Sequence, residues 1–260
     1  MDEGTLMTYQ DMFSMNGRTA LVTGSSRGIG AAIAKGFAAY GARVVVHGQR
    51  EGATADVEGS IREAGGQAVS VYCDLSTKRA GRTLIERAEA VAGPLDILVI
   101  NASAQINGTF EDVKPDDLDL QIDVNLRSTV DMLQAVLPSM AERGWGRVVN
   151  IGSINQVRPK AIVSIYAATK AAQHNLVQSL ARDYAGRGVL LNTLAPGLID
   201  TDRNADRRDS DPEAWADYVR TLNWMGRAGR PDEMVGAALF LASEACSFVT
   251  GETLILSGGY

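Results

Sequence analysis

Short runs of apolar, mostly β-branched residues recur along this chain, and alanine-rich segments with helical apolar spacing separate them. The first run is TALVT at 19–23 and the last is TLILS at 253–257. The other runs with strand character lie at 43–47, 68–73, 95–100, 147–151 and 189–194. Strands that alternate with helices form a parallel sheet with helices on both faces, and right-handed crossovers favour a doubly wound arrangement. We therefore predict an α/β fold with about seven parallel strands.

A length of 260 residues fits one large α/β domain better than two. No linker or change of composition divides the chain, so we expect a single domain of Rossmann type over residues 16–260, preceded by an extension at 1–15. The charged and aromatic segment 198–226 interrupts the alternation, and such an insertion is usually a lid or a disordered loop. Its Trp215 and Trp224 favour a lid that packs on another part of the protein.

Charge and cysteine content exclude several classes of protein. The net charge of -6 offers no basic surface for nucleic acid, and no segment has the length and apolar character of a signal peptide or a membrane span. Cys73 and Cys246 have no second cysteine or histidine at ligand spacing, which argues against a metal site and a disulfide framework. We therefore expect a cytoplasmic protein without nucleic-acid, membrane or metal partners.

A glycine-rich segment, TGSSRGIG, follows the first strand and carries Gly24, Gly28 and Gly30. Glycine allows a tight turn and a close approach of the backbone to a ligand, and the helix that follows offers free N–H groups to a pyrophosphate. The strict G-x-G-x-x-G fingerprint is absent, because Ile33 stands at its last position. Such a loop also occurs as a plain strand-to-helix turn, but its place between a strand and a helix favours dinucleotide binding.

A second local pattern, IYAATK, has Tyr166 four residues before Lys170. Residues four apart share one face of a helix, so the phenol and the ammonium can lie side by side. A free tyrosine, with a pKa of about 10, exchanges protons poorly near neutral pH, and a neighbouring ammonium favours the phenolate. Taken alone, the pair fits equally a half-buried tyrosine beside a solvated lysine.

Six motifs stand in one order along the chain: TGSSRGIG at 23–30, NAS at 101–103, Asn125 in VNLRS, Ser153 in NIGSIN, YAATK at 166–170 and APGLIDT at 195–201. In this order and spacing they resemble the short-chain dehydrogenase/reductase family over nearly the whole chain. The start FSMNGRTALVTG and the end GETLILSGG are similar to those of gluconate 5-dehydrogenase-like and 3-oxoacyl-carrier-protein reductase-like members. One departure is Ser103, where the family usually has a glycine.

The resemblance implies an enzyme that interconverts a carbonyl and a secondary alcohol, with Tyr166 as acid/base and Lys170 as its neighbour and as a ligand of the nicotinamide ribose. It implies that Ser153 binds the substrate oxygen and that Asn125 holds a water that passes protons to Lys170. The residues expected to bind the cofactor are Gly24, Ser25, Ser26, Arg27, Gly28, Ile29, Gly30, Arg50, Asp74, Leu75, Asn101, Tyr166, Lys170, Pro196, Gly197, Ile199 and Thr201.

The end of the second strand indicates which dinucleotide binds. Enzymes specific for NAD usually have an acid there that bonds the ribose 2′-hydroxyl, but here the text is HGQR and the nearest acid is Glu51. Arg27 and Arg50 suit a 2′-phosphate better than a hydroxyl, although Arg50 also fits a merely solvated position. We predict NADP(H), with NAD as the alternative.

Polar residues near the expected nicotinamide site favour a small polar substrate, sugar-derived and anionic, over an acyl chain or a steroid. These residues are Asn155, Gln156, Arg158, Lys160, Arg203, Arg207 and Arg208. We expect Arg158 to hold a carboxylate in a two-point grip. In the alternative, the basic side chains face water and pair with the neighbouring acids Asp200, Asp202, Asp206 and Asp209.

Other functions remain as alternatives. A 3-oxoacyl thioester reductase is the second candidate substrate class, and a cofactor-binding scaffold without turnover is the non-enzymatic one. A serine hydrolase built on Ser153 lacks the G-x-S-x-G elbow, and a zinc-dependent dehydrogenase lacks cysteine and histidine ligands. The resemblance also implies a homodimer or homotetramer in which helices around 115–142 and 164–186 pair across a two-fold axis.

Overall fold

A computed structural model describes residue 9 and residues 11–259. Its seven strands form one parallel sheet in the order β3-β2-β1-β4-β5-β6-β7, which confirms the predicted fold. The strands are β1 (Thr19–Val22), β2 (Arg43–Gly48), β3 (Gln67–Tyr72), β4 (Ile97–Ile100), β5 (Gly146–Ile151), β6 (Val189–Pro196) and β7 (Thr253–Leu256). Each begins and ends within two residues of the run that predicts it.

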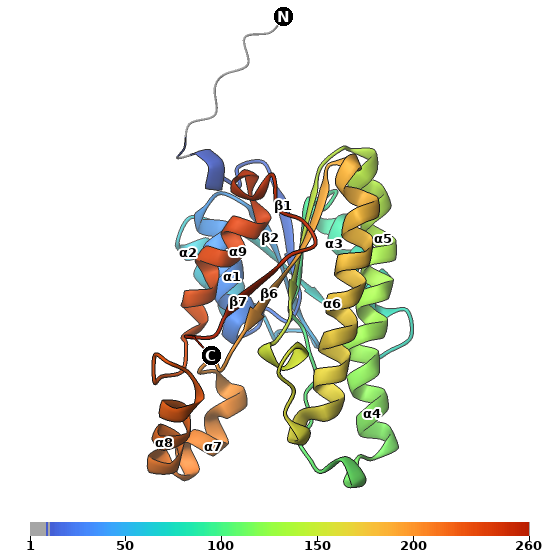
Figure 1. Cartoon of the computed structure of the whole chain (residues 1–260). Coiled ribbons are helices and arrows are strands. Elements are labelled where there is room, and N and C mark those ends of the chain that lie inside the picture. The colour runs from blue at the N-terminus through green and yellow to red at the C-terminus, as the bar shows by residue number, and fades with distance from the viewer. Residues whose placement is uncertain (1–8, 10, 260) are drawn as a thin grey trace, which may run out of the picture.

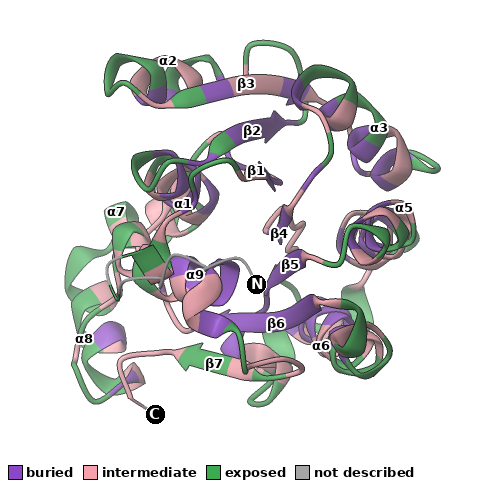
Figure 2. Cartoon of the chain, turned by 90° about the horizontal axis from the view of Figure 1, so that it is seen from above, coloured by how far each residue is buried: buried purple, intermediate pink, exposed green. Residues whose placement is uncertain are grey.

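Helices cover both faces of the sheet (Figures 1 and 2). They are α1 (Gly28–Ala39), α2 (Ala55–Glu63), α3 (Ala80–Ala92), α4 (Pro115–Ile122), α5 (Ser128–Glu142), α6 (Ser164–Tyr184), α7 (Ala205–Ser210), α8 (Pro212–Leu222) and α9 (Val235–Ala242). Helices α1, α2 and α9 pack on one face, and α3, α5 and α6 pack on the other. The molecule is therefore a single three-layer domain.

The two-residue period of a strand divides the core between these faces. On β1, Ala20 and Val22 enter the cluster shared with α1 and α9, whereas Leu21 enters the cluster shared with α3 and α5. On β2, Val44 and Val46 likewise enter the first cluster and Val45 enters the second. Because both faces are covered, the strands read as continuous apolar runs rather than as alternating ones.

The order of the strands determines where a ligand can bind. From β1 the chain steps outward to β2 and β3, then returns to β4 on the other side of β1. At this switch point the connections diverge from the carboxyl ends of β1 and β4 and leave a crevice between them. Helices α7 and α8, which follow β6, lie beside the same end of the sheet (Figure 1).

Two segments, 1–15 and 198–226, were predicted to lie outside the regular alternation of strands and helices, and the structure describes them to different extents. The extension at 1–15 falls mostly outside the described residues, but Asp11–Phe13 form one turn of 3-10 helix and Met15 is buried. The segment 198–226 contains α7 and α8, so it is helical rather than a structureless loop. Trp224 is 83% exposed, which does not fit the expectation that it anchors a lid.

No helix in the described part of the chain is both long and apolar enough to cross a membrane.

Candidate active site

Residues that follow each of the seven strands line one cleft of about 660 Å³ at the switch point of the sheet. This volume lies in the range of cofactor and substrate sites. Asp74 and Leu75, after β3, lie at one end, and Ser153 and Tyr166 lie at the other. The glycine-rich turn after β1 lies between these ends.

The glycine-rich turn has no room for side chains. Gly24 and Gly28 have φ angles of +61° and +56°, in the left-handed region that favours glycine. A Cβ on Gly24 would lie 2.8 Å from the Cα of Ala102, and one on Gly30 would lie 2.4 Å from Nδ2 of Asn101. The turn therefore packs directly on the loop after β4, and α1 begins at Gly28 with its first N–H groups at the cleft.

His47 is a buried histidine that stabilises this turn and that the local sequence pattern does not identify. His47, near the end of β2, accepts a hydrogen bond at Nδ1 from the Gly24 amide (3.0 Å) and donates from Nε2 to the Cys73 carbonyl (2.9 Å). Burial lowers the pKa of His47, and the bond to Cys73 offsets this only in part. A neutral ring with this tautomer fits both bonds. Its signal in the sequence is a lone histidine at the end of an apolar strand beside the glycine turn.

Ser25 belongs to the same support. Its side chain is fully buried and its Oγ accepts a hydrogen bond from the His47 amide at 2.9 Å. Neither Ser25 nor Gly30 lines the cleft, whereas Gly24, Ser26 and Gly28 do. The structure therefore gives Ser25 and Gly30 a role in shaping the turn rather than in contacting a ligand.

The end of the cleft beside β3 contains one carboxylate and an amide. Gln49 donates from Nε2 to Oδ2 of Asp74 at 3.1 Å. Burial alone would raise the pKa of Asp74, but hydrogen bonds from the Ser76 amide and hydroxyl and from Gln49 together lower it. Arg27 lines the cleft and forms an exposed ion pair with Asp202 (3.5 Å). Arg50 is exposed and does not line the cleft, which does not support its predicted role as a ligand.

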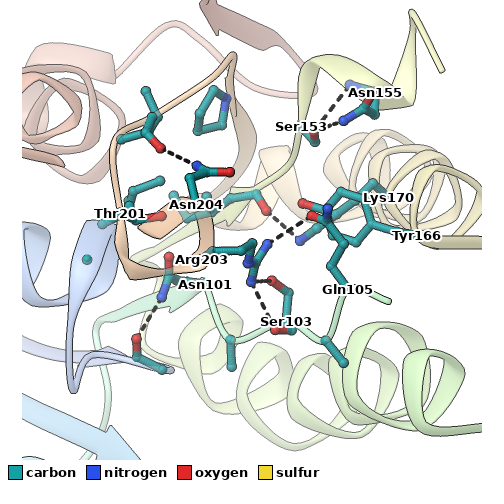
Figure 3. A pocket seen from close by; sticks show the side chains of 18 of the residues that line it. Asn101, Ser103, Gln105, Ser153, Asn155, Tyr166, Lys170, Thr201, Arg203 and Asn204 are labelled. Atoms are coloured by element: carbon teal, nitrogen blue, oxygen red, sulfur yellow. Dashed lines mark hydrogen bonds between the residues drawn. The ribbon is translucent and has the colours of Figure 1, made fainter. Parts of the chain in front are cut away.

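Tyr166 and Lys170 lie side by side on α6 at the opposite end (Figure 3). The Lys170 ammonium nitrogen is 5.8 Å from the centre of the Tyr166 ring and donates a hydrogen bond of 2.7 Å to the Ile151 carbonyl. Complete burial, assisted by the positive charge of Arg203, lowers the pKa of Lys170 to about 7. The lysine can therefore gain or lose a proton near neutral pH.

The Ser153 hydroxyl faces the same end of the cleft from the loop after β5. Its Oγ accepts two hydrogen bonds from Asn155, one from the backbone amide (3.2 Å) and one from Nδ2 (3.3 Å). These bonds occupy the lone pairs of the oxygen and leave its O–H to donate into the cleft. The serine is thus set to donate a hydrogen bond to an oxygen atom of a ligand.

Asn125 occupies a π-helical turn, Asp123–Arg127, that joins α4 to α5. Its side chain is fully buried, exchanges two 2.8 Å hydrogen bonds with the backbone of Ala104, and donates a third to the Thr169 hydroxyl. Asn125 does not line the cleft, and Gln173 bonds its carbonyl oxygen at 2.6 Å. These contacts tie the loop after β4 to α6, and the expected role of Asn125 in holding a water for Lys170 stays a prediction.

Only part of the predicted polar substrate set faces the cleft. Asn155, Lys160, Arg203 and Arg207 line it, but Gln156, Arg158 and Arg208 do not. Arg158 is exposed, so the expectation that it grips a carboxylate inside the cleft is not supported. Arg208 forms ion pairs with Asp200 and Asp209, as the alternative for these arginines predicted.

The remaining cofactor candidates surround the middle of the cleft. Asn101 donates from Nδ2 to the carbonyls of Thr23 (2.8 Å) and Gly24 (2.9 Å) and so fixes the turn to β4. The other candidates that line the cleft are Ile29, Leu75, Pro196, Gly197, Ile199 and Thr201. A long groove with a helix N-terminus at its centre and proton-exchanging groups at one end is the arrangement of Rossmann-type dehydrogenases.

Comparison with known proteins agrees with this class. A family model described as enoyl-(acyl carrier protein) reductase matches residues 24–260. A crystal structure of a 3-oxoacyl (acyl-carrier-protein) reductase from Agrobacterium tumefaciens C58 with NADP bound is 67% identical, covers 100% of both chains and has a TM-score of 0.96. The gluconate 5-dehydrogenase of Gluconobacter oxydans (strain 621H) is 36% identical over 97% of this chain and 98% of its own.

A gluconate 5-dehydrogenase from Burkholderia cenocepacia J2315, crystallised with NADP and tartrate, is 37% identical with a TM-score of 0.89 and covers 96% of this chain and 98% of its own. The chain belongs to the short-chain dehydrogenase/reductase family of oxidoreductases, as its motifs predict.

Proposed function

We propose that this protein is an NADP(H)-dependent oxidoreductase that interconverts a carbonyl group and a secondary alcohol. The observation that carries the proposal is the position of Tyr166, Lys170 and the Ser153 hydroxyl at one end of a cleft whose centre is the glycine-rich turn at the start of α1. Four similar structures, at 67%, 36%, 37% and 33% identity, contain bound NADP.

The residues present fit an NADP molecule. Gly24 and Gly28 leave space at the N-terminus of α1, where a pyrophosphate gains hydrogen bonds and the favourable helix dipole. Asp74 lies where an adenine amine would bind, and Gln49 rather than an acid stands at the end of β2. Arg27 also lines the cleft and is the cation available for a 2′-phosphate.

The bound dinucleotide would supply or accept the hydride, and the chain's own residues would handle the proton. The Tyr166 hydroxyl donates the proton to the carbonyl oxygen in reduction and takes it back in oxidation. Ser153 donates a hydrogen bond to the same oxygen and stabilises the negative charge that develops on it. Lys170, whose pKa burial lowers to about 7, lies beside the Tyr166 ring and can exchange a proton there near neutral pH.

The substrate is a small polar carbonyl compound, with a 3-oxoacyl thioester as the second candidate. Relatives of both kinds are similar to this chain: the neighbour at 67% identity is called a 3-oxoacyl reductase, and others act on gluconate. Polar and basic side chains on the catalytic half of the cleft favour the polar compound, because a polar ligand can form hydrogen bonds with them and an acyl chain cannot. Residues 198–226, with α7 and α8, would act as a lid on the domain formed by residues 16–260.

Assembly into a homodimer or homotetramer in the cytoplasm completes the proposal. Helices α4, α5 and α6 are the expected two-fold interface. Apolar side chains are also exposed at the edge of the sheet, with Phe248 fully exposed and Leu254 and Ile255 of β7 about two-fifths exposed. Light scattering at micromolar concentration tests the oligomer, and a monomer mass would contradict it.

Oxidation of NADPH with a panel of ketones, aldehydes and 3-oxoacyl thioesters tests the activity. We expect turnover with NADPH and a preference for polar ketones. A cofactor-binding scaffold would change the fluorescence of NADPH without oxidising it in the presence of any member of the panel, and this result would refute the proposal.

A further inference from the structure

Most arginines of the lid region and of the turn after it have carboxylate partners. Arg208 pairs with Asp200 and Asp209, and Arg220 pairs with Asp217. In the turn that follows α8, Arg227 and Arg230 both pair with Glu233. Exposed pairs of this kind contribute little to stability, but they leave the local charge balanced. These arginines therefore have no need of a ligand.

Three cations on the catalytic half of the cleft differ from this pattern. Within the described residues, neither Lys160 nor Arg203 nor Arg207 forms an ion pair, although all three line the cleft. Of the two acids that line it, Asp202 pairs with Arg27 and Asp74 lies at the opposite end. The catalytic half thus holds an excess of positive charge.

Neutral groups satisfy these cations in the absence of an anion. Arg203 donates from Nη2 to the carbonyl (3.2 Å) and hydroxyl (3.1 Å) of Ser103, and from Nη1 to the side-chain oxygen of Gln105 (3.2 Å), as Figure 3 shows. A carboxylate bonds a guanidinium more strongly than such neutral oxygens do, so it can replace them.

Tyr218 on α8 is the second neutral partner. Lys160 donates to its hydroxyl at 2.9 Å, and the Arg207 guanidinium lies 3.8 Å from the centre of its ring. Burial raises the pKa of Tyr218, but the hydrogen bonds and charges of Lys160 and Arg207 outweigh this and lower it. The polarised phenol indicates a site where negative charge is stabilised.

Arg203 is also close to the reacting groups. Its guanidinium lies 6.0 Å from the centre of the Tyr166 ring, so a substrate of a few carbon atoms can reach from one to the other. We propose that Arg203, supported by Lys160, Arg207 and Tyr218, binds a carboxylate of the substrate and so selects ketones that carry a carboxylate a few carbons from the carbonyl. This inference rests on the proposed function. It assigns binding of the substrate carboxylate to Arg203, in the segment 198–226, instead of to Arg158.

A 3-oxoacyl thioester fits the same site less well. Its reacting end carries no free carboxylate, and the anionic phosphate of a pantetheine arm lies many bonds from the carbonyl. The guanidinium of Arg203 and the Tyr166 ring are too close together to serve the two ends of such an arm. The geometry points to a keto acid of sugar size.

The test compares pairs of substrates that differ in one charge. Oxidation of NADPH is measured with 5-keto-D-gluconate and with L-sorbose, which has CH2OH in place of the carboxylate, and then with other keto acids and their neutral counterparts and with acetoacetyl-coenzyme A. Arg203→Gln should raise KM for the acids roughly tenfold to hundredfold, whereas KM for the neutral ketones should stay within about threefold of the wild-type value. Arg203→Lys keeps the positive charge but not the planar guanidinium that bonds a carboxylate at two points, so its KM for the acids should lie between those of wild type and Arg203→Gln.

Arg220→Gln is the matched control, because it removes one charge from the lid outside the cleft. It should leave both classes of substrate unchanged. Equal losses for acids and neutral ketones in Arg203→Gln would overturn the proposal, as would wild-type turnover of acetoacetyl-coenzyme A or L-sorbose at least as fast as that of the keto acids.

Calorimetry of the NADP+-loaded protein with D-gluconate and tartrate separates this inference from the proposed activity. Wild type should bind at least one of these acids, and Arg203→Gln should bind it at least about tenfold more weakly. Binding without turnover of any carbonyl would support the carboxylate site and refute the oxidoreductase. Failure of both acids to bind at millimolar concentration would overturn the inference.

Discussion

Replacement of Gly24 by alanine tests whether the turn after β1 is built around the missing side chain. Gly24 has a φ of +61°, and an added Cβ would lie 2.8 Å from the Cα of Ala102. The nearest atom belongs to the backbone, so no side chain can rotate away. The His47 ring, which accepts a hydrogen bond from the Gly24 amide, would move with the turn.

The expected cost has two parts. A left-handed backbone costs an alanine about 1 kcal/mol more than a glycine once the loss of unfolded-state freedom is included. Overpacking against a backbone atom adds about 1–3 kcal/mol. The free energy of unfolding should therefore fall by about 2–4 kcal/mol, which for a chain of this size lowers the melting temperature by roughly 4–16 °C.

Alanine variants at two other glycines separate the cost of the backbone conformation from the cost of overpacking. Gly52 has a φ of +80° with nothing within 4 Å of an added Cβ, so its alanine variant should lose only about 1 kcal/mol. Gly59 lies inside α2 with open space and an ordinary φ, so alanine there should stabilise the protein by about 0.5–1 kcal/mol.

Urea denaturation and thermal melting measure the stabilities of the three variants, and fluorescence titration measures their affinity for NADPH. Gly24→Ala should also bind NADPH at least about tenfold more weakly, because the turn lines the cleft. A Gly24→Ala protein as stable as Gly52→Ala would refute the steric reasoning, and unchanged NADPH binding would refute the assignment of the turn.

Three further predictions concern the catalytic and cofactor residues. Tyr166→Phe should fold and bind NADPH but lose roughly 100- to 10,000-fold in turnover, and appreciable activity in the NADPH assay would mean that another group moves the proton. The pKa of Lys170 is about 7 in the folded protein against 10.5 for an unperturbed lysine, so the unfolded chain binds the extra proton between these values and this group makes stability rise with pH across that window. Lys170→Met should remove up to about 1.4 kcal/mol per pH unit of that slope in urea titrations, and parallel pH profiles for variant and wild type would contradict the burial argument. Arg27→Ala should weaken NADPH binding roughly tenfold to hundredfold and spare NADH, whereas Arg50→Ala should change neither; a wild type that prefers NADH would reverse the cofactor assignment.

Local patterns were sufficient for the fold and for the middle of the site. The period of the apolar runs predicts seven strands, and the structure has them in one parallel sheet. The glycine turn and the Tyr166–Lys170 pair are contained in segments of eight and six residues, whose geometry follows from the turn and helix that they form. The sequence also located the segment 198–226 that interrupts the alternation, and this segment contains α7 and α8.

Contacts between residues that are far apart in the chain could not be predicted from local sequence patterns. Asn125 lies in a π-helical turn, and its side chain bonds Ala104 and Thr169, two contacts that the local motif does not predict. His47 was passed over because its partners, Gly24 and Cys73, become neighbours only when β1, β2 and β3 pair.

The sequence by itself determined which elements form and where the chemistry-bearing residues stand along them, because a helix or a strand repeats at a fixed spacing. It listed the basic residues expected near the substrate and favoured Arg158 over Arg203 and Arg208. Only the tertiary structure separates these arginines: Arg158 does not line the cleft, Arg203 meets Ser103, 100 residues away, across the cleft, and Arg208 finds its acids within its own segment. A charged side chain takes the best partner that the folded chain brings within reach, and that partner is set by the packing of the whole domain.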